Sequence, residues 1–323
     1  MLQASLPTTD CRVLPGKLPS RPPVDASVAH PRLGTIRYRT LGEPGLAPLV
    51  VVGGISADRK VDHWWPDITA GDEGGLSPRR FRLISIDWLA QLRCGRPVQT
   101  GDQADALLAV INDLGLDRIE ALVGASYGAM VGLAFAARHG RSLGRLIAIS
   151  GAHRSRAAAT AGRLIQRSII TAAIEHGRPE LGVALARTLA LTSYRPESLF
   201  ERRFFDDDPA VTMASLHRYL DYNGERFAGH FDAGRYLALS ESLDRHRVEP
   251  DRITCPVELI AATSDTLVPL TQMRALAGAI GLNARLHVID SPFGHDAFLK
   301  SPERINPLLA RLLADVAGGC HDQ

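Results

Sequence analysis

The chain has 323 residues, of which 45% are hydrophobic and 22% charged, and its 37 basic residues nearly balance its 35 acidic ones. This length suits one large α/β domain or two small domains. A net charge of +2, with no long run of one sign, provides no basic surface for binding nucleic acid. No apolar stretch reaches the roughly 18–20 residues of a membrane span, and no signal-peptide pattern opens the chain, so we expect a cytoplasmic protein.

The cysteines are too far apart in the sequence for a disulfide framework or a zinc site. They are Cys11, Cys94, Cys255 and Cys320. All but three of the basic residues are arginine. We attribute most of this excess of arginine over lysine to a GC-rich coding sequence, but planar guanidinium groups also suit the binding of small anionic substrates.

The chain opens on residues 1–34, which are rich in Pro, Ser and Thr and lack apolar periodicity, so we expect an extended N-terminal arm. From Tyr38 onward, short apolar runs alternate with longer helical patterns. Runs with Val, Ile and Leu on both faces are typical of a parallel sheet that is covered on both sides. The sequence therefore predicts an α/β fold with strands in six segments: 48–56, 81–88, 119–126, 145–152, 257–265 and 284–291.

Two segments between these strands fit crossover helices, at residues 102–114 and 127–139. About 100 residues with several helical patterns and no clear strand separate the fourth and fifth predicted strands. Because this is too long for one crossover, we expect a helical insertion at 153–250 over the carboxyl edge of the sheet, where open α/β sheets bind ligands. Residues 35–152 and 251–318 would then form the α/β core domain, which contains the sheet.

The pentapeptide Gly124-Ala125-Ser126-Tyr127-Gly128 has the pattern G-x-S-x-G, and it lies between a predicted strand and a predicted helix. In this context the small flanking residues permit a sharp turn that lifts the serine hydroxyl out of the sheet. We therefore expect Ser126 to be a nucleophile. The alternative is a tight turn whose serine only caps the helix.

A serine hydroxyl needs a base to take its proton, and the base needs an acid to orient it. In this scaffold the acid and the base follow the serine in that order, each after a strand. Asp265 and His295 occupy these positions, so they are predicted to be the orienting acid and the general base. Asp87 and Asp290 end or lie within other predicted strands. His153 also follows a predicted strand but comes too early in the chain order, and the other nine histidines are expected at the surface or in the core.

An oxyanion hole needs two backbone N–H groups that point at the developing negative charge. One is expected from Tyr127, which follows the nucleophile. The other is expected from Ile55, in the glycine-rich loop after the strand at 48–52. No glycine pattern supports a dinucleotide-binding or P-loop site, which disfavours hydride transfer and nucleotide-driven chemistry.

With this elbow and these triad positions, the sequence resembles the MetX-type homoserine O-acyltransferases of methionine biosynthesis, which have the α/β-hydrolase fold with a helical lid. The resemblance runs from about residue 34 to residue 312. The elbow motif is common to many esterases, but the other blocks are much narrower. The blocks are GASYGAM at 124–130, SYRPESLFERRF at 193–204, YLDYNGERFAGHFDAGRYLALSESLD at 219–244 and GHDAFLK at 294–300.

The resemblance implies roles for further residues. Asp296 would hold the amino group of the acceptor, Arg167 would receive its carboxylate, and Tyr236 would border the pocket. It also implies a homodimer formed through the helical insertion, no permanently bound cofactor, and acyl-CoA as co-substrate.

The chain also departs from the family pattern. Tyr127 replaces the usual methionine after the nucleophile, and Gly128-Ala129-Met130 replaces the usual Gly-Gly-Met. Gly53-Gly54-Ile55-Ser56 replaces the usual His-Ala-Leu-Thr loop, and His230 replaces an arginine. These positions border the expected acyl site, so the choice between an acetyl and a succinyl donor stays open.

The predicted reaction is a ping-pong transfer of an acetyl or succinyl group from acyl-CoA, through an acyl-serine, to the hydroxyl of L-homoserine. Serine is an alternative acceptor. An esterase or thioesterase would use the same triad, and a binding protein could keep the scaffold without catalysis. The complete triad argues against the binding protein.

Overall fold

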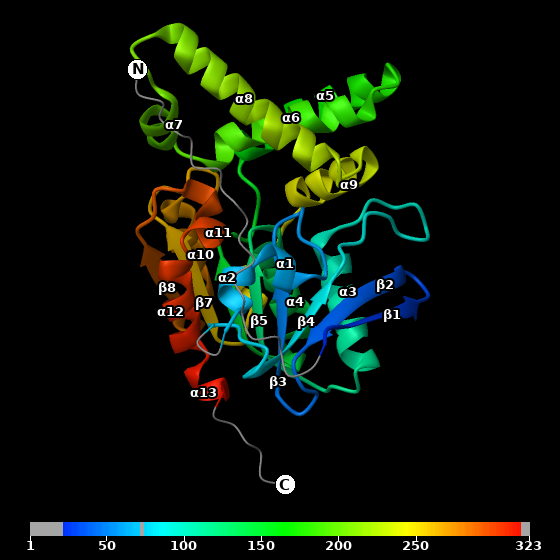
Figure 1. The fold of residues 1–323 in the computed structure, drawn as a ribbon. Coiled ribbons are helices and arrows are strands. Elements are labelled where there is room, and N and C mark those ends of the chain that lie inside the picture. Colours follow the sequence, from blue (N-terminus) through cyan, green and yellow to red (C-terminus); the bar gives the residue numbers. More distant parts are fainter. Residues whose placement is uncertain (1–21, 72–73, 318–323) are drawn as a thin grey trace.

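A mixed sheet forms the centre of the computed structural model, which describes residues 22–71 and 74–317 (Figure 1). Its strand order is β1-β2-β4-β3-β5-β6-β7-β8. Strands β3 to β8 are parallel to one another, and β2 is antiparallel to both β1 and β4. The strands are β1 (Val24–His30), β2 (Gly34–Leu41), β3 (Ala47–Val52), β4 (Phe81–Ile86), β5 (Ile119–Ala125), β6 (Leu143–Ile149), β7 (Val257–Ala262) and β8 (Ala284–Ile289).

The predicted α/β-hydrolase fold is confirmed, and each of the six predicted strand segments contains one of the strands β3 to β8 or most of it. The inner strands form because they can bury both faces. All six residues of β7 are buried, as are the last four of β3, β4 and β6. Such continuous apolar runs are what a sheet covered on both faces requires.

The N-terminal hairpin corrects one prediction. The expected extended arm over residues 1–34 is wrong in its last part, because β1 pairs with β2 from Val24 opposite Thr40 to His30 opposite Gly34. Residues 1–21 lie outside the described residues. Strand β1 is at the edge of the sheet with its side chains exposed or half-buried, so it needs no apolar run and lacks the pattern that marks inner strands.

Helices cover both faces of the sheet (Figure 1). On one face, α3, α4 and α10 pack with residues such as Leu107, Phe135 and Met273, and on the other, α1, α2, α11 and α12 pack with residues such as Trp65 and Phe298. Helix α4 spans the predicted residues 127–139, and α3 begins two residues before its predicted start. The helices are α1 (Val61–Trp64), α2 (Pro66–Thr69), α3 (Thr100–Asp113), α4 (Tyr127–His139), α10 (Leu270–Ile280), α11 (Ala297–Lys300), α12 (Pro302–Leu312) and α13 (Ala314–Ala317), with 3-10 turns at Gly140–Ser142, Pro250–Arg252, Gly281–Asn283 and Gly294–Asp296.

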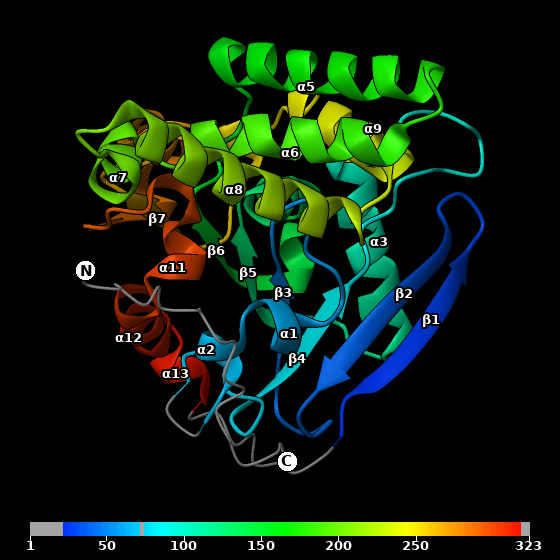
Figure 2. The same cartoon turned by 45° about the horizontal axis from the view of Figure 1, so that its top comes forward.

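Five helices between β6 and β7 form a lid above the sheet (Figure 2). All of them lie inside the segment 153–250 that we expected to be a helical insertion. Proline at the first position starts α6 and α8, and aspartate side chains cap α8 and α9, both of which favour a helix start. The lid helices are α5 (Ala157–Glu175), α6 (Pro179–Tyr194), α7 (Glu197–Phe204), α8 (Pro209–Ala228) and α9 (Ala233–Asp244).

Candidate active site

A sharp turn between β5 and α4 carries Ser126. Its backbone φ is 54° and its ψ is −114°, a strained conformation of the kind that concentrates at functional sites. The flanking glycines are required by close packing. A Cβ on Gly124 would come within 2.3 Å of the Gly128 carbonyl oxygen, and a Cβ on Gly128 within 2.3 Å of that of Val52. The G-x-S-x-G pattern therefore lets the elbow pass close to the neighbouring strand.

Ser126, His295 and Asp265 form a hydrogen-bonded relay. The distance between Ser126 Oγ and His295 Nε2 is 2.8 Å, and that between His295 Nδ1 and Asp265 Oδ2 is also 2.8 Å. Asp265 follows β7, and its Oδ1 accepts hydrogen bonds from the backbone N–H groups of Leu267 and Val268 at 2.9 Å. These bonds fix the carboxylate. The structure thus brings together the three residues predicted from the sequence, in the geometry of a nucleophile, a base and an orienting acid.

The environment of His295 favours its protonated form. Burial by itself disfavours the imidazolium, but the charge and hydrogen bond of Asp265, together with the charge of Asp296, outweigh it and raise the pKa of His295 above its ordinary value. The imidazole and the Asp265 carboxylate are almost fully buried. A base in this setting can hold the proton it takes from a nucleophile.

The two predicted oxyanion donors are the N–H groups of Ile55, in the loop after β3, and of Tyr127, at the start of α4. The Gly128 N–H donates to the Gly53 carbonyl oxygen at 2.8 Å, which holds the loop before Ile55 against the start of α4. Among the described residues, neither the Ile55 nor the Tyr127 backbone N–H has an acceptor, so both are available to an oxyanion. Their role stays a prediction.

The side chain of Tyr127 points away from this site. It is fully buried, its hydroxyl lies 2.8 Å from Ser242 Oγ, and its ring packs edge-on against Trp88. Burial raises the pKa of the Tyr127 hydroxyl to about 12. Replacement of the family's usual methionine by tyrosine is therefore accommodated in the core, where Tyr127 joins the elbow helix to the end of α9.

A cavity of about 310 Å³ opens above Ser126, between the sheet and the lid, a volume typical of small-molecule sites. Ser126, His295 and Ile55 line its floor, and α5, α6 and α9 contribute its upper wall. On α5 the lining residues recur three or four positions apart, at Ala159, Arg163 and Gln166 among others. One face of this helix thus looks into the cavity.

Two of the three residues that the resemblance assigned to the substrate line the cavity, and the third does not. Asp296 and Tyr236 line the cavity. Arg167 is not among its lining residues, because its guanidinium binds Asp244 at 2.7 Å and Ser240 Oγ at 2.9 Å at the flank of the α5 face. One turn earlier on α5, Arg163 lines the cavity and also binds Asp244. The predicted contact of Arg167 with an acceptor carboxylate has no support from this placement.

Two residues of α6 that the sequence analysis did not select, Arg187 and Tyr194, also line the cavity. The Arg187 guanidinium lies over the rings of Tyr194 and Phe227, at 5.3 and 4.7 Å from their centroids, and no carboxylate among the described residues pairs with it. The Tyr194 ring lies 5.8 Å from that of His295. Their separation of seven residues, two helical turns on one face of α6, is the signal that could have identified them.

The rival carboxylates have other partners. Asp87 is bound by Arg37 and Arg59, and Asp290 accepts a hydrogen bond from Thr263. Within residues 22–71 and 74–317, no three His, Cys, Asp or Glu side chains are grouped as metal ligands would be, and no helix has the length and apolar character to span a membrane.

Known proteins with related sequences share this architecture. Residues 48–302 match the family model of the alpha/beta hydrolase fold. The homoserine O-succinyltransferase of Xanthomonas campestris pv. campestris is 38% identical over 291 residues, which cover 86% of this chain and 78% of that protein. The homoserine O-acetyltransferase of Mycolicibacterium paratuberculosis is 33% identical, covering 81% and 77%.

Among solved structures, homoserine O-acetyltransferase from Bacillus anthracis matches with a TM-score of 0.80 at 16% identity, covering 91% of this chain and 98% of that one. At 16% identity this match shows only the shared fold. The sequence relatives also show the family, because their identity of 33–38% extends over most of both chains. The chain belongs to the homoserine O-acyltransferases, a family of acyltransferases with the α/β-hydrolase fold.

Proposed function

We propose that the protein transfers an acyl group, acetyl or succinyl, from acyl-CoA to the hydroxyl of L-homoserine, through an acyl-serine on Ser126. The observation that carries the proposal is the cavity in which the Ser126–His295–Asp265 relay meets Arg187, a guanidinium without a carboxylate partner among the described residues. An amino acid supplies the carboxylate that such a guanidinium binds.

In the first half-reaction, Ser126 Oγ attacks the thioester carbonyl while His295 Nε2 takes the hydroxyl proton. The Ile55 and Tyr127 N–H groups donate to the carbonyl oxygen as it gains negative charge. When the tetrahedral intermediate breaks down, the C–S bond is cleaved and His295 returns the proton to the leaving sulfur. CoA departs as the thiol and the acyl group remains on Ser126.

In the second half-reaction, the homoserine hydroxyl attacks the acyl-serine and gives its proton to His295 Nε2. The new ester leaves, and the proton returns to Ser126. The carboxylate of the acceptor would bind Arg187, beside Tyr194. Its ammonium would bind Asp296 Oδ1, since Oδ2 of that residue is held by Arg195 Nε at 3.1 Å.

Water competes with the acceptor at about 55 M, but a hydroxyl held in register can reach effective molarities of about 10⁵ M or more. An acceptor bound at both ends, beneath a lid of five helices, has this advantage. The same geometry explains why a triad common to hydrolases can favour transfer.

The test measures CoA thiol release from acetyl-CoA and succinyl-CoA, with and without L-homoserine, and identifies the product by mass spectrometry. We expect homoserine to accelerate release and to yield an O-acyl ester. Release that homoserine does not accelerate, without such an ester, would identify a thioesterase instead. L-Serine in place of L-homoserine tests the alternative acceptor, and we expect it to be the poorer substrate.

The proposal includes a homodimer that forms through the lid. Large apolar side chains are exposed on its outer helices, among them Leu164 and Ile165 on α5, with 53% and 56% exposed, and Met213 on α8, with 71% exposed. Burying such a surface against a second copy would be favourable. Sedimentation at micromolar concentration should give twice the monomer mass of 34.9 kDa, and a monomer alone would contradict this part of the proposal.

A further inference from the structure

One wall of the cavity carries more positive charge than the acceptor can neutralise. Arg163, Arg187 and Tyr236 line the cavity, and Arg167 lies at its flank with its guanidinium on Ser240 and Asp244. Burial raises the pKa of the Tyr236 hydroxyl, and the charges of all three guanidinium groups act on it in the opposite direction. Asp244 is the carboxylate that binds Arg163 and Arg167. Three guanidinium groups and one carboxylate leave two positive charges at this wall, which we call the arginine wall.

The remaining carboxylates of the cavity do not change this balance. Asp296 is paired with Arg195, and Asp265 with His295. L-Homoserine brings one carboxylate to the arginine wall, and its ammonium shares Asp296 with Arg195, so the charge balance at Asp296 is the same for either donor. With an acetyl donor, one positive charge of the arginine wall would therefore lose its remaining water on substrate binding and find no anion, which is costly for a guanidinium that is already mostly buried.

Gln166 adds a donor at the same place. It lines the cavity with only 5% of its surface exposed, and its Oε1 accepts a hydrogen bond from the Tyr236 hydroxyl at 2.9 Å. This bond fixes the orientation of the amide and leaves its NH₂ group without an acceptor among the described residues. Arg163 lies one turn earlier on the same face of α5, so the two side chains present donors and no free acceptor.

We infer that the acyl group of the donor ends in a carboxylate, which Arg163 and Gln166 bind, so that the preferred donor is the CoA thioester of a short dicarboxylic acid, succinyl-CoA rather than acetyl-CoA. This inference rests on the proposed function. Arg187 receives the carboxylate of the acceptor, and the two carboxylates of the product ester match the two positive charges of the arginine wall.

The first experiment compares kcat/KM for succinyl-CoA, acetyl-CoA and the neutral monoamide of succinyl-CoA, with saturating L-homoserine. A site built to bind a polar group rejects analogues that lack it. We expect succinyl-CoA to exceed both of the others by about 100-fold or more. Equal or better use of acetyl-CoA would overturn the inference.

The second experiment uses the variants Arg163→Met and Gln166→Glu. Arg163→Met removes one positive charge but leaves Asp244 paired with Arg167, so no buried carboxylate is orphaned. Gln166→Glu keeps the shape of the side chain and places a negative charge where the donor carboxylate binds. We expect each variant to lower the ratio of kcat/KM for succinyl-CoA to kcat/KM for acetyl-CoA by roughly 10- to 100-fold, because only the succinyl donor loses a charge-assisted contact.

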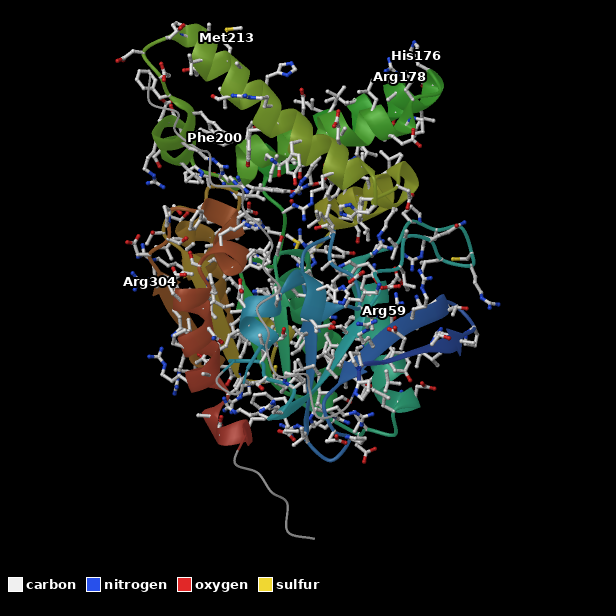
Figure 3. All side chains as sticks on the ribbon, viewed as in Figure 1. Arg59, His176, Arg178, Phe200, Met213 and Arg304 are labelled. Atoms are coloured by element: carbon white, nitrogen blue, oxygen red, sulfur yellow. The ribbon has the colours of Figure 1, made fainter. Side chains whose placement is uncertain are left out.

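The matched control is Arg178→Met, which removes an exposed arginine between α5 and α6, at the tip of the lid (Figure 3). Arg178 is not among the residues that line the cavity. We expect it to leave both donors unaffected. If Arg163→Met instead raises KM for L-homoserine while the donor preference is unchanged, Arg163 serves the acceptor and the inference fails. If no acyl-CoA gives homoserine-dependent thiol release, it is the proposed function that fails.

Discussion

The sheet and the lid are held together in different ways. In β7 all six residues are buried, whereas in the 19 residues of α5 only Gln166 and Ile170 are. The sheet is ordered by continuous apolar burial between two layers of helices, and the lid contributes a polar inner surface in which Arg163 and Arg167 bind Asp244 and Tyr236 donates to Gln166. The sheet layer therefore positions the reacting groups, and we expect the polar layer above it to select what they react with.

If this division is right, changes in the sheet layer should abolish chemistry or folding, and changes in the lid should alter substrate use. Replacement of the nucleophile tests the first part most strongly. Ser126→Ala should lower kcat by about 10⁴-fold or more, because no other group takes the acyl chain. Steady-state thiol release measures this. The matched control, Ser168→Ala at an exposed position of α5, should retain full activity, and more than a tenth of the activity in Ser126→Ala would show that Ser126 is not the nucleophile.

The second largest effect is expected in the lid, at Arg187. Arg187→Met should lower kcat/KM for L-homoserine by roughly 100-fold, since a charge-assisted bond to the acceptor is lost. The burst of thiol release that reports acylation of Ser126 should change by less than about 3-fold. Rapid-mixing measurements separate the two half-reactions. Equal loss in both would place Arg187 outside the acceptor site.

A pair of glycine substitutions compares the two layers by stability. Gly128→Ala would bring its Cβ to 2.3 Å from the Val52 carbonyl oxygen and should destabilise the protein by about 1–3 kcal/mol, since backbone cannot yield easily. Gly162→Ala, inside α5 with no atom from another described part of the chain within 4 Å of the added Cβ, should stabilise it by about 0.5–1 kcal/mol through helix propensity. Urea unfolding measures both. A stable Gly128→Ala variant would contradict the tight packing of the elbow.

The smallest effect concerns the pH dependence of acylation. Its base is neutral His295, whose pKa is raised, so kcat/KM for the donor should fall as pH drops through a midpoint above 6.5. The negative charge of Asp296 contributes to this raised pKa, and Asp296→Asn should therefore move the midpoint toward lower pH. Asp290→Asn, an exposed carboxylate bound to Thr263, is the control and should leave the midpoint in place. A shift toward higher pH in Asp296→Asn would contradict the electrostatic argument.

Much of the fold and the candidate triad could be predicted from the sequence because both follow local patterns. The inner strands are continuous apolar runs, and Ser126, Asp265 and His295 each follow one of them. Asp265 lies 139 positions after Ser126 in the chain, and His295 lies 30 positions after Asp265. Because parallel strands end at the same edge of a sheet, the sequence nevertheless predicts that the three residues meet there. The edge strand β1 was missed for the complementary reason: its exposed side chains need no apolar run.

The lid residues could not be selected in the same way. Arg163 and Arg167 are four residues apart on α5, and nothing in their local sequence distinguishes the one that lines the cavity from the one held at its flank by Asp244 and Ser240. Arg187 on α6 is one of many arginines in the lid segment, and nothing in the neighbouring sequence marks it as the one that lines the cavity. The rotation of each helix against its neighbours decides which guanidinium faces the cavity, and that rotation depends on contacts far along the chain.

The sequence by itself determined the family, the order of the inner strands along the chain and the three residues expected to react. Motifs indicate the family and these residues, and continuous apolar runs indicate the strands. Only the tertiary structure decided which charges meet above Ser126. Packing of α5, α6 and α9 brings three guanidinium groups and one carboxylate to a common wall. Charge balance at such a wall depends on distances between helices rather than on positions within any one of them.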